Sequence, residues 1–273
     1  MLKYLKFGLK TIINIIIFLI FFIPFYWMIL TSLKTLGQTL KMPPIFFVSD
    51  PQFSNFTQVF KTIPFFSMLK NSIIITACII LCQIITVIPA AYAFARFRFK
   101  GKNILFGTTL LTMMIPAQLI FLPVFLLFSK LNMINSYTSL ILPSACSAFS
   151  IFMLRQTFKQ VPEELLEAAR LDKANEWKIL SKIMIPIAKP TVVTMLLLTF
   201  INSWNDYFWP LVLTTNNDVR PLTVGISSLR QVEGGISYQI LMAGNVLLVV
   251  PIIIVFILAQ KHIIKAFTYM GEK

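Results

Sequence analysis

Long apolar runs recur along this chain, and short charged or proline-containing segments separate them. A helix of about 20 apolar residues is long enough to cross the hydrocarbon core of a bilayer. The mean hydropathy of +0.81 excludes an ordinary soluble domain. We therefore predict an all-α membrane protein with six transmembrane helices. The predicted spans are residues 11–33, 71–94, 103–128, 138–154, 191–213 and 240–259.

The first run follows Lys3, Lys6 and Lys10 and is too long for the core of a signal peptide. It also lacks a small-x-small cleavage site, so we treat it as a membrane span. Residues 34–70 are polar and rich in proline, and we expect only short helices there. The chain is thus divided by function into three parts. They are a first helix with an extracytoplasmic loop (1–70), a five-helix core (71–265) and a cytoplasmic tail (266–273).

Prolines lie inside several predicted spans. A proline inside a helix removes one backbone hydrogen bond and clashes with the preceding turn, so it bends or breaks the helix. We expect Pro24 to kink the first span and Pro143 to interrupt the fourth, and we place Pro116 and Pro123 inside the third.

Charged residues are concentrated in the segment 160–190, between the fourth and fifth spans. Its pattern predicts a helix, a turn and a second helix. Pro162 suits the first position of the first helix, where Glu163 and Glu164 complement the positive helix end. Asn175 is a candidate N-cap for the second helix, which we expect Pro186 to stop.

Each helix of this segment has one predicted contact face. The face of the first helix carries residues at i, i+3, i+4 and i+7, and its small alanines would let it sink into a partner's groove. An amphipathic helix lying on its own bundle or on lipid headgroups has the same periodicity. The two predicted faces are Leu165, Ala168, Ala169 and Asp172, and then Trp177, Leu180, Ser181 and Met184.

The distribution of basic residues predicts the orientation in the membrane. With the N-terminus inside, the segments on the cytoplasmic side hold 17 of the 24 Lys and Arg residues. Positive charge favours the cytoplasmic side, so both termini and the charged segment are predicted to be cytoplasmic. The net charge of +14 then reflects topology, and we expect no nucleic-acid partner.

Polar side chains interrupt the fifth span near its end. A carboxylate at membrane depth is costly, so it is expected to face a partner or a wet cavity. Amide, carboxylate and indole groups also suit the hydroxyls and ring faces of sugars. The alternative is an aromatic belt at the outer interface, beside Tyr207 and Trp209. The candidate pore or substrate-lining residues are Asn202, Trp204, Asn205 and Asp206.

Several segments resemble one family in chain order. EELLEAARLD at 163–172 resembles the EAA loop of permeases of maltose-type carbohydrate ABC importers, and AYAFAR at 91–96 resembles a second segment of that family. MIP at 114–116, NSY at 135–137 with LILP at 140–143, LRQ at 154–156 and WN at 204–205 with WPL at 209–211 match it too. The family usually has glycine where this chain has Lys173. A left-handed conformation there would cost a lysine about 1 kcal/mol.

This resemblance implies a type I ABC importer permease (MetI-like) fold with a cytoplasmic coupling-helix loop. It implies a second permease in a heterodimer, two cytoplasmic ATPase subunits, an extracytoplasmic solute-binding protein and a carbohydrate substrate in a bacterial inner membrane. It also implies no enzymatic activity and no cofactor in this chain, which has no G-x-x-x-x-G-K-[ST] motif. The coupling residues would be Glu163, Glu164, Leu165, Glu167, Ala168, Ala169, Asp172 and Trp177.

Two alternative classes fit the residues less well, a secondary transporter or channel and a membrane-embedded enzyme, and no metal or nucleophile cluster supports the enzyme. A secondary transporter or channel would act without an ATPase, but it would be expected to show an internal repeat and buried coupling charges, and only Asp206 is a candidate. A metal site is not predicted, because no His or further Cys stands near Cys78 and Cys82.

Overall fold

A computed structural model describes residues 2–232 and 235–268, with side chains described for residues 8–230 and 237–260. The chain divides into two compact units. Unit 1 comprises Met1–Phe66 and Val224–Ile252, and unit 2 comprises Ser67–Thr223 and Ile253–Lys273. Most of the predicted tail, residues 269–273, lies outside the described residues.

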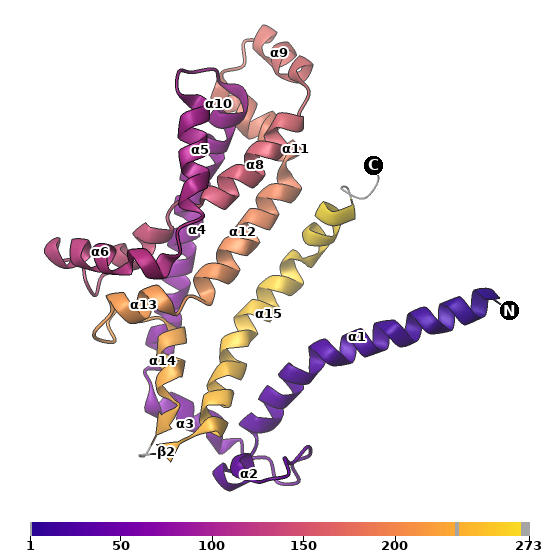
Figure 1. The fold of residues 1–273 in the computed structure, drawn as a ribbon, viewed down its shortest axis with the longest axis vertical. Coiled ribbons are helices and arrows are strands. Elements are labelled where there is room, and N and C mark those ends of the chain that lie inside the picture. The colour runs from indigo at the N-terminus through magenta and orange to yellow at the C-terminus, as the bar shows by residue number, and fades with distance from the viewer. Residues whose placement is uncertain (1, 233–234, 269–273) are drawn as a thin grey trace. The chain divides into compact units, whose positions relative to one another are not determined.

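Unit 1 contains three helices from the start of the chain and a second group from near its end (Figure 1). The first group is α1 (Leu2–Ser32), α2 (Leu36–Leu40) and α3 (Ser54–Thr62). The second group is most of α14 (Leu222–Ser228), the strands β1 (Gln231–Val232) and β2 (Gly235–Ile236), and the first half of α15 (Tyr238–Thr268). The strands pair in antiparallel fashion. The short helices expected within 34–70 are therefore confirmed as α2 and α3.

Local contacts explain how the chain turns after α1. Thr35 accepts a hydrogen bond from the backbone of Gln38, and the Gln38 side chain accepts one from the Thr35 backbone, which forms a capping box for α2. The Asn55 amide donates to the carbonyls of Ser32 and Lys34, at 2.9 Å each, and so holds the start of α3 against the end of α1.

Unit 2 contains α4 (Phe65–Arg96), of which the first two residues are counted with unit 1, and the helices that follow it. These are α5 (Lys102–Thr112), α6 (Ala117–Lys130), α7 (Tyr137–Ile141), η1 (Leu142–Ser144), α8 (Ala148–Gln160), α9 (Glu163–Leu171), α10 (Glu176–Ile179), η2 (Leu180–Met184), α11 (Ile185–Ile187), α12 (Lys189–Trp204) and α13 (Phe208–Leu213).

Three helices of the described chain are long and apolar enough to cross a membrane, namely Gly8–Ser32, Phe65–Arg96 and Tyr238–Gln260. They confirm the first, second and sixth predicted spans. Three bent helix pairs bring the number of crossings to six if each pair is one span.

The third predicted span is not one straight helix. It is α5 followed by α6, at an angle of 98°. The break precedes Pro116, whose backbone is extended and whose missing N–H prevents the first helix from continuing. Pro123 lies inside α6 without breaking it. The fourth span is interrupted at Pro143 as expected, with an angle of 42° between α7–η1 and α8.

The fifth predicted span, 191–213, is also not one continuous helix. The helix α12 begins earlier, at Lys189, and ends at Trp204, and α13 begins only at Phe208. At its other end α12 meets the preceding helix Glu176–Ile187 at 83°. Three residues, 205–207, are therefore not helical where a continuous span was predicted.

Two apolar clusters form the core of unit 2. The larger one joins α4, α8, α9 and α12 and includes Val87, Leu154, Phe158, Leu166 and Met195, all 0% exposed. The smaller one, with Ile75, Phe128 and Leu213, joins α4, α6 and α13. Because α4 contributes to both clusters, it is the element that links the two ends of this unit.

Candidate functional site

Residues 160–190, which we call the elbow, fold as two short arms joined by a tight turn at one end of unit 2 (Figure 1). The first arm is α9. Pro162 is the residue before the helix, with extended ψ of 138°, so the helix begins one residue later than predicted, at Glu163. Glu163 and Glu164 occupy its first turn, where their charges favour the positive helix end.

The turn after α9 has the backbone geometry of a Schellman motif. The Lys173 N–H donates to the Arg170 carbonyl and the Ala174 N–H donates to the Ala169 carbonyl, both at 3.0 Å. Lys173 has a φ of 58°, the left-handed conformation that this motif requires. The lysine therefore occupies the position where a glycine would be unstrained.

The second arm begins at the predicted cap. The Asn175 side chain accepts from the Lys178 N–H at 2.8 Å, which confirms the N-cap. Pro186 does not stop this arm, contrary to expectation. The preceding turns, Leu180–Met184, widen into a π-helix, and Pro186 continues as part of α11. A wider turn changes which carbonyl faces the proline ring, and π-turns of this kind interrupt the regular hydrogen-bond ladder.

Of the predicted contact face of α9, only Ala169 is buried within this chain. Leu166 (0% exposed) and Ala169 (9%) pack against unit 2, whereas Leu165, Ala168 and Asp172 are exposed. Of the predicted face of the second arm, Leu180 and Met184 are buried, Ser181 is half-buried and Trp177 is 69% exposed. Glu164 and Glu167 are exposed as well. Ala169 therefore packs within this chain.

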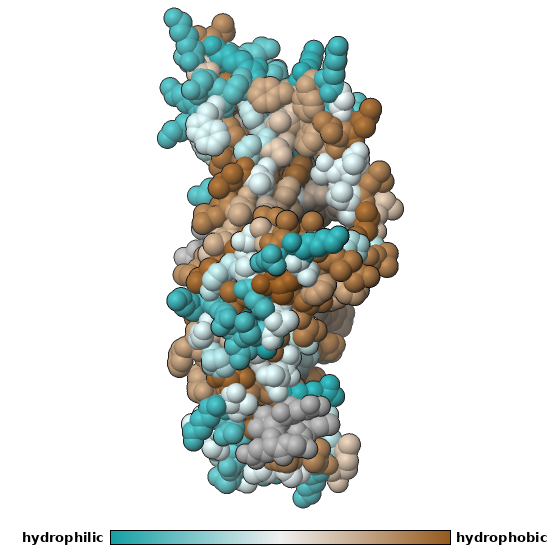
Figure 2. Space-filling model, turned by 90° about the vertical axis from the view of Figure 1, so that its left-hand side faces the viewer, coloured by the Kyte–Doolittle hydropathy of each residue, from teal (hydrophilic) through white to brown (hydrophobic). Residues whose placement is uncertain are grey.

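The outward side of the elbow combines charge with exposed apolar groups. Leu165 is 48% exposed, Leu171 84% and Trp177 69%. Figure 2 shows hydrophilic side chains gathered at this end of unit 2, above a predominantly hydrophobic zone. A large apolar side chain that is surrounded by polar ones and covered by nothing in its own chain is typical of an interaction site.

One ion pair and one hydrogen bond attach the elbow to α4. The Arg96 guanidinium donates to Glu163 at 2.7 Å, and the Tyr92 hydroxyl donates to Glu176 at 2.5 Å. Arg170 lies between the two acids, 3.1 Å from Glu176 and 3.4 Å from Glu163. The hydrogen bond to Glu176 is the main cause that raises the pKa of Arg170 above its ordinary value.

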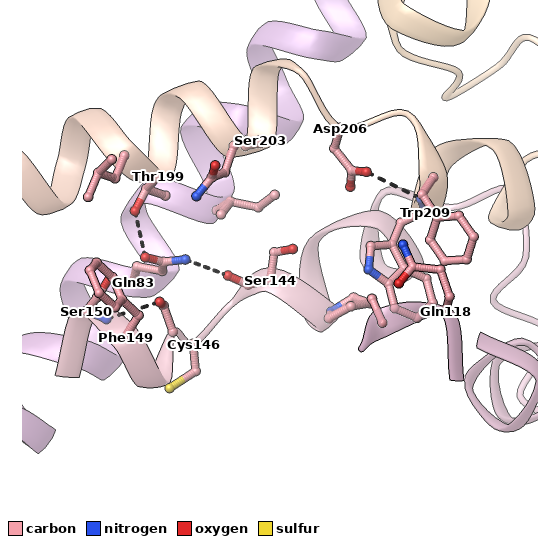
Figure 3. Close-up of a pocket in the computed structure, with 17 residues that line it drawn as sticks. Gln83, Gln118, Ser144, Cys146, Phe149, Ser150, Thr199, Ser203, Asp206 and Trp209 are labelled. Atoms are coloured by element: carbon pink, nitrogen blue, oxygen red, sulfur yellow. Dashed lines mark hydrogen bonds between the residues drawn. The ribbon is translucent and has the colours of Figure 1, made fainter. Parts of the chain in front are cut away.

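A cavity of about 590 Å³ lies within unit 2, away from the elbow (Figure 3). Figure 3 shows Gln83, Thr199 and Phe149 toward one side of it and Asp206, Trp209 and Gln118 toward the other. The lining combines amide and hydroxyl groups with aromatic rings. The lining residues are Ile79, Gln83, Ala117, Gln118, Pro143, Ser144, Cys146, Ser147, Phe149, Ser150, Leu198, Thr199, Asn202, Ser203, Asp206, Phe208 and Trp209.

Two of the four predicted lining residues, Asn202 and Asp206, border this cavity. The other two do not. Trp204 is 3% exposed and stacks on Phe200 with ring centroids 5.6 Å apart. The Asn205 amide donates to the Ile201 carbonyl at 2.9 Å and caps the end of α12. Trp204 is two residues after Asn202 on α12 and therefore points to a different side of that helix.

The cavity includes a residue that sequence reasoning missed. Gln83, in the middle of α4, is 6% exposed, donates to the Ser144 carbonyl at 2.9 Å and accepts from the Thr199 hydroxyl at 2.7 Å. The sequence contains a feature that could have identified Gln83. Its side chain is an amide inside an uncharged apolar run, where a polar group needs a hydrogen-bond partner.

The comparisons with known proteins agree on one family. The family described as "Binding-protein-dependent transport system inner membrane component" matches residues 87–269. The arabinooligosaccharides transport system permease protein AraQ of Halalkalibacterium halodurans is 36% identical over 244 residues, covering 89% of this chain and 86% of the relative. The Bacillus subtilis protein of the same name is 33% identical over 267 residues, covering 96% of this chain and 94% of the relative.

Among solved structures, a chain of a bacterial ABC transporter involved in the import of the acidic polysaccharide alginate has a TM-score of 0.80 at 28% identity. The match covers 94% of this chain and 96% of that chain. With the apolar helices described above, this fold is that of an importer permease. The chain therefore belongs to the family of binding-protein-dependent transport system inner membrane components, as a multi-pass permease subunit of an ATP-binding-cassette importer.

Proposed function

We propose that this permease carries a sugar or oligosaccharide, delivered by an extracytoplasmic binding protein, across the inner membrane. ATP hydrolysis takes place in separate ATPase subunits, which dock on the elbow, and a second permease subunit completes the pathway. The carbohydrate assignment is supported by two relatives named for arabinooligosaccharides and by a structural relative that imports a polysaccharide.

The observation that carries the ATPase assignment is the outward side of the elbow. Trp177, Leu171 and Leu165 are exposed at the charged end of an apolar bundle. A tryptophan supplies much of the binding free energy in many interfaces when a partner's pocket encloses it, and the two exposed leucines add apolar area around it. The acids Glu163, Glu164, Glu167 and Asp172 and the small Ala168 belong to the same proposed docking face, and Ala169 supports it from beneath.

The orientation of the chain belongs to this proposal. With both termini in the cytoplasm, the elbow lies on the side of the membrane that holds ATP, and the excess of bases on that side favours this arrangement.

We further propose that the cavity is the part of the solute pathway that this subunit provides. Asn202, Gln83 and Gln118 offer amides for hydroxyl groups, and Asp206 offers a carboxylate. Trp209, which borders the cavity, takes the place of Trp204 as the flat apolar surface for a sugar ring. Small-molecule sites commonly combine such apolar walls with a few convergent polar groups.

A photo-crosslinking experiment tests the docking and the orientation together. A photoreactive phenylalanine analogue is placed at Trp177 or at Leu171. The matched control position is Phe47, which is 84% exposed, as Leu171 is, but lies in the segment before α3. In the assembled complex the first two positions should crosslink to the ATPase subunit, and Phe47 should not.

Crosslinks from Phe47 to the ATPase, together with none from the elbow, would overturn both the docking and the orientation. Solute uptake that proceeds at full rate in proteoliposomes lacking the ATPase would instead support a secondary transporter or channel.

A further inference from the structure

The contacts between α4 and the elbow form a closed ring of five side chains. In order they are Arg96, Glu163, Arg170, Glu176 and Tyr92, joined by contacts of 2.7, 3.4, 3.1 and 2.5 Å. The ring closes through α4 itself, because Tyr92 and Arg96 are four residues apart and share one helix face. It thus ties both arms of the elbow, α9 through Glu163 and α10 through Glu176, to a single turn of α4.

Ring packing and further hydrogen bonds hold Tyr92 and Arg96 in place. Tyr92 is 3% exposed, and its ring lies edge-on to those of Phe97 and Phe158 at 5.4 and 6.2 Å. The Arg96 side chain is 9% exposed and also donates to the carbonyls of Phe158 and Val161. These carbonyls end α8 just before α9, so Arg96 bridges the elbow and the helix that leads into it.

Stability alone does not explain this arginine. Its Nε is buried, and within the described part of the chain it has no hydrogen-bond partner. A buried charge with one donor unpaired is costly, and apolar residues that fill the same space are often as stable or more so. A role in positioning the elbow accounts for a charged group at this point.

The helix that carries the ring also reaches the cavity. Gln83 is nine residues before Tyr92 in α4, which corresponds to about 13 Å along the helix axis. Gln83 and Ile79 line the cavity, and Gln83 bonds both Ser144 and Thr199. The second connection from the elbow to the cavity runs along the chain, through the π-helix η2 and the 83° bend before α12. From Gln83 to Tyr92, across Pro89, α4 is one unbroken helix, whereas the other connection is interrupted at both places.

We propose that Tyr92 and Arg96 are positioning residues that make the elbow and α4 move together, so that a displacement of the elbow by the ATPase reaches the cavity wall at Gln83. This inference rests on the proposed function. It assigns a mechanical role to the segment 91–96, which docking on the elbow leaves unexplained.

The test is the ratio of solute imported to ATP hydrolysed, measured in proteoliposomes that contain the complete transporter and the binding protein. Tyr92→Phe keeps the packed ring and removes only the hydrogen bond to Glu176. Loss of a bond to a charged acceptor should shift the equilibrium between the tied and the untied elbow about tenfold. We expect ATP hydrolysis to continue while solute imported per ATP falls at least about twofold.

The matched control is Tyr137→Phe. The Tyr137 hydroxyl donates to the Asn71 side chain at 2.6 Å, also within unit 2 but outside the ring. This variant loses a part-buried tyrosine hydrogen bond to a neutral amide, so it should cost no more stability than Tyr92→Phe and should leave solute per ATP unchanged. A merely structural role for Tyr92 would make the two variants behave alike.

A second variant checks the identity of the partner. If Tyr92 acts through Glu176, then Tyr92→Phe combined with Glu176→Gln should lower the ratio no further than Glu176→Gln alone. An unchanged ratio in Tyr92→Phe, an equal fall in Tyr137→Phe, or fully additive effects in the double variant would overturn the inference. Absence of sugar uptake by the unaltered transporter would instead contradict the proposed function.

Discussion

Lys173→Gly is expected to stabilise the turn at the middle of the elbow. Lys173 has a φ of 58° at the Schellman position, and its own N–H and that of Ala174 make the two bonds that end α9. A side chain with a Cβ in this conformation costs roughly 1–2 kcal/mol. Glycine avoids this strain but loses about 0.5–1 kcal/mol more backbone entropy when the turn is ordered. The net gain should be about 0.5–1 kcal/mol.

Hydrogen exchange measures this gain where it arises. If the amides of Lys173 and Ala174 exchange by local opening of the turn, a gain of about 0.5–1 kcal/mol slows them roughly two- to fivefold. Peptides that cover the turn are followed by mass spectrometry in the purified complex. Peptides from α5, which does not contact the turn through any of the bonds described, provide the internal reference.

Lys173→Ala separates backbone strain from loss of the lysine side chain. Alanine removes the exposed charged chain and retains the Cβ, so exchange should stay as in the unaltered protein or become faster. If Lys173→Ala slowed exchange as much as Lys173→Gly, the gain would come from the lost side chain, and the strain argument would be refuted. Equal exchange in Lys173→Gly and the unaltered protein would refute it as well.

Two substitutions, one in each unit, test the packing by thermal unfolding in detergent, and each has a control variant. In Gly244→Ala the new Cβ would lie 2.8 Å from Leu229 Cδ1, in a site where Leu229 is 0% exposed, so we expect a loss of about 1–3 kcal/mol. Gly107→Ala, where no atom lies within 4 Å, should instead be neutral or stabilising. Gln83→Leu leaves the Ser144 carbonyl without its donor and should cost about 1–3 kcal/mol, whereas Gln156→Leu at an exposed site of α8 should cost little.

Local rules in the sequence predicted the start of the second arm of the elbow, whereas α9 begins one residue later than predicted and Pro186 does not end the second arm. Asn175 caps the second arm, and the left-handed backbone of Lys173 lies where the family usually has glycine. Both features depend on a few neighbouring residues, so they can be inferred without knowledge of the rest of the fold. The long uninterrupted helices α4 and α15 were predicted for a similar reason, since apolar length alone determines them.

The bends and the buried faces could not be inferred in the same way. A proline indicates that a helix is interrupted, but the angles of 98° and 42° at two such interruptions depend on what each helix packs against. Leu165 and Leu166 are adjacent and chemically identical, so periodicity could not decide which one is buried. The contacts of Glu163 and Arg170 orient α9 and thereby place Leu166 inward.

The ring on α4 shows why two segments far apart in the chain had to be interpreted together. Arg96 and Glu163 are 67 residues apart, and Tyr92 and Glu176 are 84 apart, so neither pair is visible as a local pattern. Ala91, beside Tyr92, is 0% exposed and belongs to the larger apolar cluster, where a small side chain permits close packing. The alternation of small, aromatic and basic residues in 91–96 is therefore what a helix needs at a point where it must hold a charged, solvent-facing loop. A segment that only crossed the membrane would need no arginine and no tyrosine hydroxyl there.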